Sequence, residues 1–144
     1  MNLPVTAVPG LRPFAPRIDR FSRHFWQQLE HGLLLASRCT ACDWLTFPPK
    51  RRCPRCLADQ FKWQTLQGQG TLYTFTRVHA GAEAFAAWLP YWLAVIDTAE
   101  EVRLVTRLLV GPGREPVPGM AVQLAVQKFE DGPLFVAQLE TQTR

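Results

Sequence analysis

Two closely spaced cysteine pairs constrain this chain more than any other feature. The pairs are Cys39-Thr-Ala-Cys42 and Cys53-Pro-Arg-Cys56, ten residues apart, and they hold all 4 cysteines of the chain. Two CxxC pairs at this spacing bring four thiolates together in the tetrahedral arrangement of a structural zinc site. We therefore predict a zinc ribbon in which Cys39, Cys42, Cys53 and Cys56 bind a structural Zn²⁺.

A pair of disulfides, or two redox-active CxxC motifs, would be the alternative. Disulfides form mainly in oxidising compartments, and the first residues, Met1-Asn2-Leu3-Pro4, lack the basic and then apolar pattern of a secretory signal. No apolar run is long enough to span a bilayer. We expect a soluble, cytoplasmic protein without a membrane partner, and its net charge of +4 permits an anionic partner without requiring one.

The first third of the chain divides into an arm and a helix. Four prolines within residues 1–18 exclude a helix or a central strand, so this segment is an extended arm, either frayed or ordered against a partner. Residues 19–32 are predicted to form a helix, with Asp19 as its N-cap and Gly32 at its end. Its apolar stripe favours packing onto the rest of the fold over a partner-binding role; the stripe consists of Phe21, Phe25, Trp26 and Leu29.

The remaining residues have the pattern of strands and turns. Residues 33–66 form the zinc ribbon, with strands at 33–38 and 61–66 on either side of the cysteines. In residues 67–144 we expect strands at 71–78, 91–96, 102–110, 121–129 and 134–139, with a hairpin turn at Asp131-Gly132 and a helix-length pattern only at 82–89. Five strands in so short a span predict a five-stranded OB-fold barrel. The fold class is thus mainly β: an N-terminal helix, a zinc ribbon and an OB-fold barrel.

The order of these segments resembles the DUF35 family, in which a rubredoxin-like zinc ribbon precedes an acyl-CoA-associated OB fold. The resemblance covers about residues 20–139 and rests on the succession of the following motifs. These are Phe25-Trp26, Gly32-Leu33-Leu34-Leu35, the two cysteine pairs with Phe47-Pro48-Pro49 between them, Gly68-x-Gly70-Thr71-Leu72-Tyr73-Thr74-Phe75 and Leu89-Pro90-Tyr91.

This resemblance implies a noncatalytic subunit that assembles with thiolase-like enzymes, or in some cases with hot-dog-fold hydratases. Reactions of such complexes include thiolytic cleavage and acetyl transfer to phloroglucinol-type rings. We expect a hetero-oligomer in which this chain bridges catalytic subunits that act on acyl-CoA or acylated aromatic substrates. Because all four cysteines are kept, the metal-binding role of the family carries over to Cys39, Cys42, Cys53 and Cys56.

The residues themselves offer no independent catalyst. Four zinc-bound thiolates leave neither a nucleophilic cysteine nor an open metal position for a reactive water. His24 and His31 belong to the predicted helix, whereas His79 ends a strand, where it is either a solvated loop residue or a ligand contact. No serine elbow, paired-carboxylate motif or phosphate-binding glycine loop is present. We predict no activity for the isolated chain.

Two kinds of surface are candidates for binding. The basic residues Lys50, Arg51, Arg52 and Arg55 offset the negative charge of a zinc–thiolate centre or contact coenzyme A phosphates. For the partner interface we predict Phe14 in the arm, with Phe85 and Trp88 in the loop 80–89. Arg103 and Arg107 share a strand face that we interpret as a solvated surface.

Single-stranded nucleic acid is the alternative partner, because OB folds and zinc ribbons both bind it. Tyr73, Phe75 and Arg77 on one strand face would supply the stacking platform. The modest net charge of +4 and its lack of a clear stripe make nucleic acid the less favoured partner.

Overall fold

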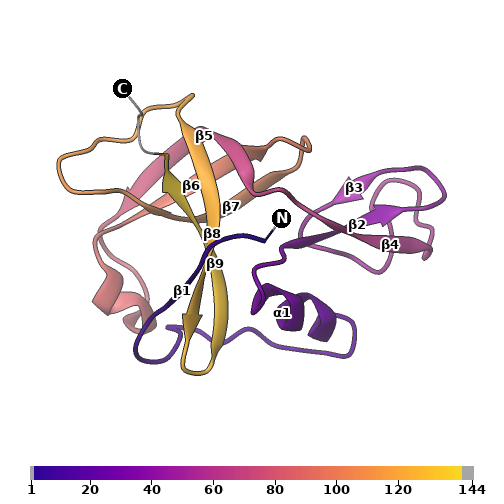
Figure 1. Cartoon of the computed structure of the whole chain (residues 1–144), viewed down its shortest axis with the longest axis horizontal. Helices are drawn as coiled ribbons and strands as arrows, with labels where there is room; N and C mark the ends of the chain where they lie inside the picture. Colours follow the sequence, from indigo (N-terminus) through magenta and orange to yellow (C-terminus); the bar gives the residue numbers. More distant parts are fainter. Residues whose placement is uncertain (1, 141–144) are drawn as a thin grey trace.

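A five-stranded barrel and a three-stranded ribbon lie side by side, with a short helix in the angle between them (Figure 1). The computed structural model describes residues 2–140. The barrel strands are β5 (Gln69–Val78), β6 (Tyr91–Thr98), β7 (Arg103–Leu109), β8 (Ala121–Phe129) and β9 (Gly132–Leu139). The other elements are β1 (Val5–Ala7), α1 (Arg23–Leu29), the ribbon strands β2 (Leu35–Cys39), β3 (Leu45–Thr46) and β4 (Phe61–Thr65), and the 3₁₀ helix η1 (Glu83–Trp88). In this part of the chain no helix has the length and apolarity that crossing a membrane requires.

The strand order β8-β5-β6-β7-β9 closes on itself because β8 also pairs with β9. This closure confirms the predicted five-stranded barrel and the hairpin turn, whose strands begin to pair at Phe129 and Gly132. In β8 the alternate residues Val122, Leu124 and Val126 are fully buried, and Ala125 between the last two is also buried, at 6% exposure. Because closure pairs every barrel strand on both sides over at least part of its length, few backbone groups are left unpaired.

The strict alternation predicted for residues 71–78 is wrong after Leu72. The register of β5 against β6 shifts between Leu72 and Thr74, where a β-bulge inserts one extra residue. The bulge turns Phe75 toward the same side as the buried Leu72, and its ring meets Trp92 edge-on at 5.5 Å. Phe75 is therefore part of the packed core surface and does not share an outer face with Tyr73.

The helix ends near the predicted signal, but it begins later than predicted, because its N-cap residue is Ser22 and not Asp19. The Asp19 carboxylate accepts a hydrogen bond from the Ser22 backbone N–H at 2.7 Å, and the Ser22 hydroxyl accepts one from Asp19 N–H at 3.0 Å. Gly32 ends the helix with φ of 81°, and Leu33 N–H bonds back to the Gln28 carbonyl. Regular α-helix is limited to Arg23–Leu29, so it is shorter than the predicted span of 20–31.

The helix packs inward on the fold, as its apolar stripe predicts. Phe25 and Leu29 are buried, and Phe21 stacks on Trp63 of β4 with ring centroids 5.4 Å apart. One continuous core joins these residues to Leu34 and Leu66 of the ribbon and to the barrel interior. The ribbon and the barrel consequently share a single core at their junction.

The N-terminal arm is ordered against its own barrel, which differs from both a frayed end and a partner-dependent segment. Strand β1 runs parallel to β8 and pairs Val5 with Val126. Leu3 is 4% exposed and donates its N–H to the Gly32 carbonyl at 2.7 Å. Further along, the Arg12 guanidinium lies against Gly132 and bonds the Asp131 carbonyl at 2.7 Å. The Arg12 backbone amide, together with that guanidinium, lowers the pKa of Asp131.

Gly32 is predicted to be indispensable because the arm crosses directly over it. A Cβ at this position would lie 2.5 Å from the Leu3 carbonyl oxygen, whereas a Cβ at Gly113, which also has positive φ, would meet nothing within 4 Å. Gly113→Ala should then cost about 1 kcal/mol of unfolding free energy, for the backbone strain alone. Gly32→Ala should cost about 3 kcal/mol, because overpacking adds to that strain. Urea unfolding followed by circular dichroism measures the unfolding free energy of both variants. Equal losses of free energy would show that the arm moves away from residue 32 without destabilising the protein.

Candidate metal centre

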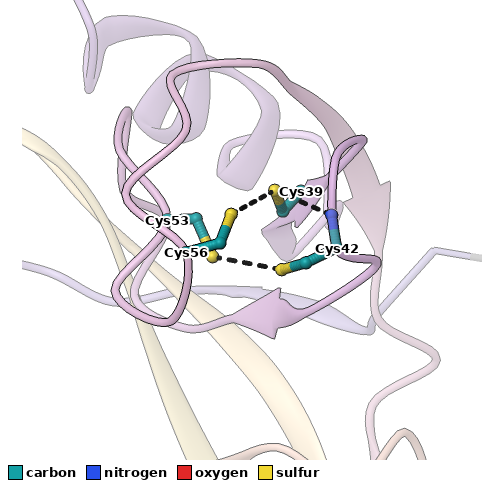
Figure 2. A group of neighbouring side chains, drawn as sticks. All are labelled: Cys39, Cys42, Cys53 and Cys56. Atoms are coloured by element: carbon teal, nitrogen blue, oxygen red, sulfur yellow. Dashed lines mark hydrogen bonds between the residues drawn. The ribbon is translucent and has the colours of Figure 1, made fainter.

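The four cysteine sulfurs converge on one point (Figure 2). Cys39 pairs with Phe61 at the end of the ribbon opposite to Leu34 and Leu66, which join the barrel core. All four Sγ atoms lie within 4.8 Å of one another, and the pairs Cys39–Cys56 and Cys42–Cys53 are 3.6 Å apart. A zinc ion about 2.3 Å from each of four tetrahedral sulfurs sets those sulfurs roughly 3.8 Å apart. The cluster therefore has the donor type, number and spacing that Zn²⁺ takes in structural sites. Separations of 3.6 Å are too long for disulfide bonds, and no disulfide joins these cysteines in the structure.

The two CxxC loops have the same backbone geometry. In each loop the first cysteine carbonyl accepts a hydrogen bond from the residue after the second cysteine, Asp43 at 3.0 Å or Leu57 at 2.9 Å. Both of those residues are in the left-handed region, with φ of 68° and 67°. Each loop also aims a backbone N–H at its first sulfur, from Cys42 to Cys39 and from Arg55 to Cys53. Four sulfurs are thus presented by two copies of one turn.

The surroundings of the cysteines lower the pKa of two thiols but raise the pKa of a third. Four thiolates are therefore not stabilised together without a cation. The backbone amide of Cys42 lowers the pKa of Cys39. Burial raises the pKa of Cys53, but the amides of Cys56 and Arg55 outweigh it and bring the value to about 7. At Cys42 the Trp44 amide lowers the pKa, yet burial and the three neighbouring sulfurs raise it to about 12. A divalent cation would remove this conflict, because metal binding stabilises all four thiolates together.

The predicted basic residues are exposed, and two of them have contacts beside the second CxxC loop. Lys50, Arg51, Arg52 and Arg55 are all exposed. The Arg52 guanidinium donates to the Leu57 carbonyl at 3.1 Å, and the Arg55 guanidinium lies 4.9 Å from the Trp44 ring centroid. These two side chains hold the second CxxC loop in place, while Lys50 and Arg51 point a positive charge at solvent. The suggested contact of Lys50, Arg51 and Arg52 with coenzyme A phosphates stays a prediction.

The predicted partner residues differ in exposure. Phe14 is 70% exposed and has Leu11 nearby in the arm at 68%. Phe85 and Trp88 are half-buried, and their rings pack together at 5.8 Å beside Tyr91. Phe14 therefore presents the larger free apolar surface, and the role of all three residues as an interface stays a prediction.

Arg107 is not part of a solvated face, contrary to our interpretation of its strand. Its guanidinium lies 3.6 Å from the Trp88 ring centroid and donates to Gln127 at 2.7 Å. Burial in this position lowers the pKa of Arg107. The cation holds η1 against the barrel, an arrangement that strand alternation alone does not indicate because the two residues are 19 positions apart. Arg103, in contrast, is exposed as predicted and pairs with Asp97 at 2.7 Å.

The remaining sequence candidates do not assemble into a second site. His24 packs against Trp63 at 5.2 Å, while His31 and His79 are exposed. The nucleic-acid platform is also incomplete: Phe75 faces the core, Arg103 lies 3.8 Å from the Tyr73 ring centroid, and Arg77 stacks on Trp92.

One feature that sequence reasoning missed is an apolar groove of about 350 Å³ between the helix, the ribbon and the barrel. Its walls come from distant segments; they include Phe25, Trp26, Phe47, Val105 and Phe135. The only available signal was the Phe-Pro-Pro segment between the cysteine pairs, which has no ligand role of its own. A second missed feature is the exposure of Trp44 and Leu57 beside the cysteines, at 45% and 65%.

Comparison with known proteins agrees with this architecture in both parts of the chain. Residues 26–62 match the family model described as "ChsH2, rubredoxin-like zinc ribbon domain", and residues 63–127 match "ChsH2, C-terminal OB-fold domain". The chain belongs to the DUF35 family. The division between the two family models falls within β4, four residues earlier than the boundary that we predict after residue 66.

Several DUF35 relatives are subunits or scaffolds. The chain is 28% identical over 117 residues to a "DUF35 domain-containing scaffold protein" of Methanocaldococcus jannaschii, covering 79% of this chain and 83% of that protein. It is 33% identical to a "probable enoyl-CoA hydratase alpha subunit" of Thermomonospora curvata, covering 80% of this chain but only 35% of that longer protein. A solved structure titled "Ltp2-ChsH2(DUF35) aldolase" matches with a TM-score of 0.74 and 28% identity, covering 87% of this chain and 98% of that one.

Replacing one cysteine tests whether all four act together. Cys53→Ser should abolish bound zinc and unfold the ribbon, because three thiolates and a hydroxyl no longer close the site. Ala41→Ser, which adds a hydroxyl at an exposed position of the other CxxC loop, should retain zinc. Metal content by mass spectrometry of the purified variants distinguishes them, and normal zinc in Cys53→Ser would refute a four-cysteine site.

Proposed function

We propose that this DUF35 protein is a noncatalytic, zinc-stabilised OB-fold subunit that bridges the catalytic subunits of a thiolase-like complex. The complex would act on acyl-CoA or acylated aromatic substrates, by thiolytic cleavage or by acyl transfer. The observation that carries the proposal is the closed four-sulfur centre in a chain whose relatives are subunits and scaffolds of enzymes.

The chemistry of the centre supports a structural role. Four thiolates fill the coordination sphere of Zn²⁺, so no position is left for water or substrate. When bound, the ion would fix the two CxxC loops relative to each other, and the chain's own residues would then present a rigid surface. A thiolase-like reaction needs an activated nucleophile, and the described histidines lie on the helix and on a strand end, away from the cysteine cluster.

Comparison with relatives supports a catalytic partner on another chain. The matching solved structure is titled as an aldolase formed with Ltp2, and it corresponds to this chain over nearly the whole ChsH2 part. By analogy, the reaction would take place on the partner, and this chain would hold the assembly together. The basic residues Lys50, Arg51 and Arg52 would then lie where coenzyme A phosphates of the substrate can be bound.

An accessory role in an acyl-CoA hydratase is the second candidate. The specific observation in its favour is the 33% identity to the enoyl-CoA hydratase alpha subunit, in which the matched part makes up 35% of the length. In that arrangement the unmatched part of the longer relative would carry functions that, for this chain, a separate subunit supplies. The identity of the catalytic partner therefore distinguishes the two candidates.

Purification from the native host tests the proposal. An affinity-tagged copy should co-purify in a fixed ratio with a thiolase-like acyl-CoA enzyme, identified by mass spectrometry. The two purified subunits should reconstitute an activity that this chain alone lacks. A hydratase-type partner would favour the second candidate, and an isolated monomer would refute both.

Phe14→Ser should weaken this association about tenfold or more without loss of stability, because an exposed aromatic side chain contributes strongly to interfaces but little to the fold. Val117→Ser is the matched control, since Val117 is another exposed apolar side chain, at 51%, on the barrel. Titration calorimetry of each variant with the partner gives the affinity. Equal binding by Phe14→Ser and the unmodified protein would remove the arm from the interface.

A further inference from the structure

We propose that the ribbon tip, defined as Trp44 and Leu57 with the cations Lys50, Arg51, Arg52 and Arg55, docks onto an acidic-rimmed apolar recess of the catalytic subunit. This inference rests on the function proposed above and names the surface and the chemistry of the contact. It does not involve the arm or the apolar groove beside the helix.

Leu57 is the first reason, because neither its backbone conformation nor the exposure of its side chain favours leucine for the stability of the fold. Its φ of 67° lies in the left-handed region, where a bulky side chain is rare and glycine or asparagine is favoured. Its side chain is nevertheless 65% exposed. A residue that strains the backbone and buries little is retained more readily for contact with another molecule than for stability.

The equivalent position in the other CxxC loop supports this distinction. Asp43 occupies the same place, with φ of 68° and the same hydrogen bond to the first cysteine carbonyl. Aspartate tolerates this conformation far better than leucine. Both CxxC turns therefore require a left-handed backbone at the residue after the second cysteine. Asp43 suits this conformation, whereas Leu57 is an apolar residue that does not.

Charge is the second reason. Residues 33–66 contain 6 of the 16 lysine and arginine residues but only 2 of the 12 aspartate and glutamate residues, so the ribbon carries the whole formal net charge of +4. A zinc ion with four thiolates is formally anionic, which offsets part of this excess and leaves the ribbon cationic. Four of the cations, Lys50, Arg51, Arg52 and Arg55, are exposed and lie within six consecutive residues that lead into the second CxxC loop, and this run of positive side chains suits an acidic surface.

The tip is also held in one conformation before any partner arrives. Arg52 donates to the Leu57 carbonyl at 3.1 Å, and Arg55 lies 4.9 Å from the Trp44 ring centroid. An apolar centre with a cationic rim, already ordered, loses little conformational entropy on binding.

An acidic protein surface fits this tip better than nucleic acid does. Single strands bind by stacking bases on free aromatic faces. Here Arg55 lies over the Trp44 ring, and the most exposed apolar side chain at the tip is aliphatic. A leucine with neighbouring arginines instead suits an apolar recess with carboxylates around it.

The decisive variant is Leu57→Asn, because a structural role and a docking role predict opposite results. Asparagine relieves the left-handed strain, so the melting temperature should stay the same or rise. The dissociation constant for the purified catalytic subunit should nevertheless increase about tenfold or more. Asp43→Asn is the matched control at the equivalent turn and should leave that constant unchanged. Unchanged binding by Leu57→Asn, while the unmodified protein binds, overturns the inference alone. Failure of the unmodified protein to bind overturns the proposed function as well.

Charge reversal tests the acidic rim separately. Arg51→Glu should weaken the complex and flatten its dependence on NaCl concentration, whereas Lys128→Glu, a charge reversal at an exposed position of barrel strand β8, should do neither. Equal effects of the two reversals would mean that binding depends on the total net charge of the protein and not on the position of Arg51 at the tip. That result would contradict the inference. Tight binding of a labelled single-stranded oligonucleotide, lost in Arg51→Glu, would assign the tip to nucleic acid and equally overturn it.

Protection of Cys56 supplies a direct footprint. Cys56 is the one exposed cysteine among the four and precedes Leu57 in the chain. A partner seated on the tip should slow the transfer of zinc from the protein to a coloured chelator. An unchanged transfer rate at saturating partner would place the interface elsewhere.

Discussion

Convergence of the four cysteine sulfurs is the constraint on which the ribbon depends. Its sheet contains strands of 5, 2 and 5 residues, too few to bury a core of their own. At the base, Leu34 and Leu66 join the barrel core, so that end is held by apolar packing. At the other end the four sulfurs of the two CxxC loops lie within 4.8 Å of one another. Apolar packing thus fixes one end of the ribbon, and a metal ion bound by the four sulfurs would fix the other.

Local patterns predicted most of the fold because most of its elements follow local rules. Alternation in β8, the Asp-Gly turn and the Asp19 and Gly32 helix signals depend on residues close in sequence. The β5 bulge could not be predicted, since Leu72-Tyr73-Thr74-Phe75 is equally compatible with a regular strand. The arm was harder still: Leu3 is buried by Gly32 and by Gly68, where its side chain occupies the space of an absent Cβ. These two glycines lie 29 and 65 residues from Leu3, and contacts over such distances produce no periodic pattern in the sequence.

The candidate metal centre was predictable for a related reason. Cysteine spacing encodes the ligand set directly, because each CxxC loop positions two sulfurs with its own backbone. What surrounds the ligands was not encoded in the same way. The contact of Arg107 with Trp88 joins β7 to η1, and the partial burial of Phe75 follows from the β5 bulge, so neither can be inferred from the spacing of residues within one strand. Phe75 and Trp88, which we predicted as binding surfaces, are thus partly packed into the fold. Phe14, another predicted surface residue, is exposed, and so is Leu57.

A rigid, charged tip is consistent with a subunit that selects its partner without taking part in chemistry. The zinc site and the backbone of its loops fix the relative positions of the cations, so a matching acidic surface gains electrostatic attraction with little reorganisation. Such attraction mainly raises the association rate and rejects partners of the wrong charge. Apolar contact, through Leu57 and the arm, would then slow dissociation. The tip and the arm belong to segments that one continuous core joins, so the stability of that core determines whether both can contact one partner at the same time.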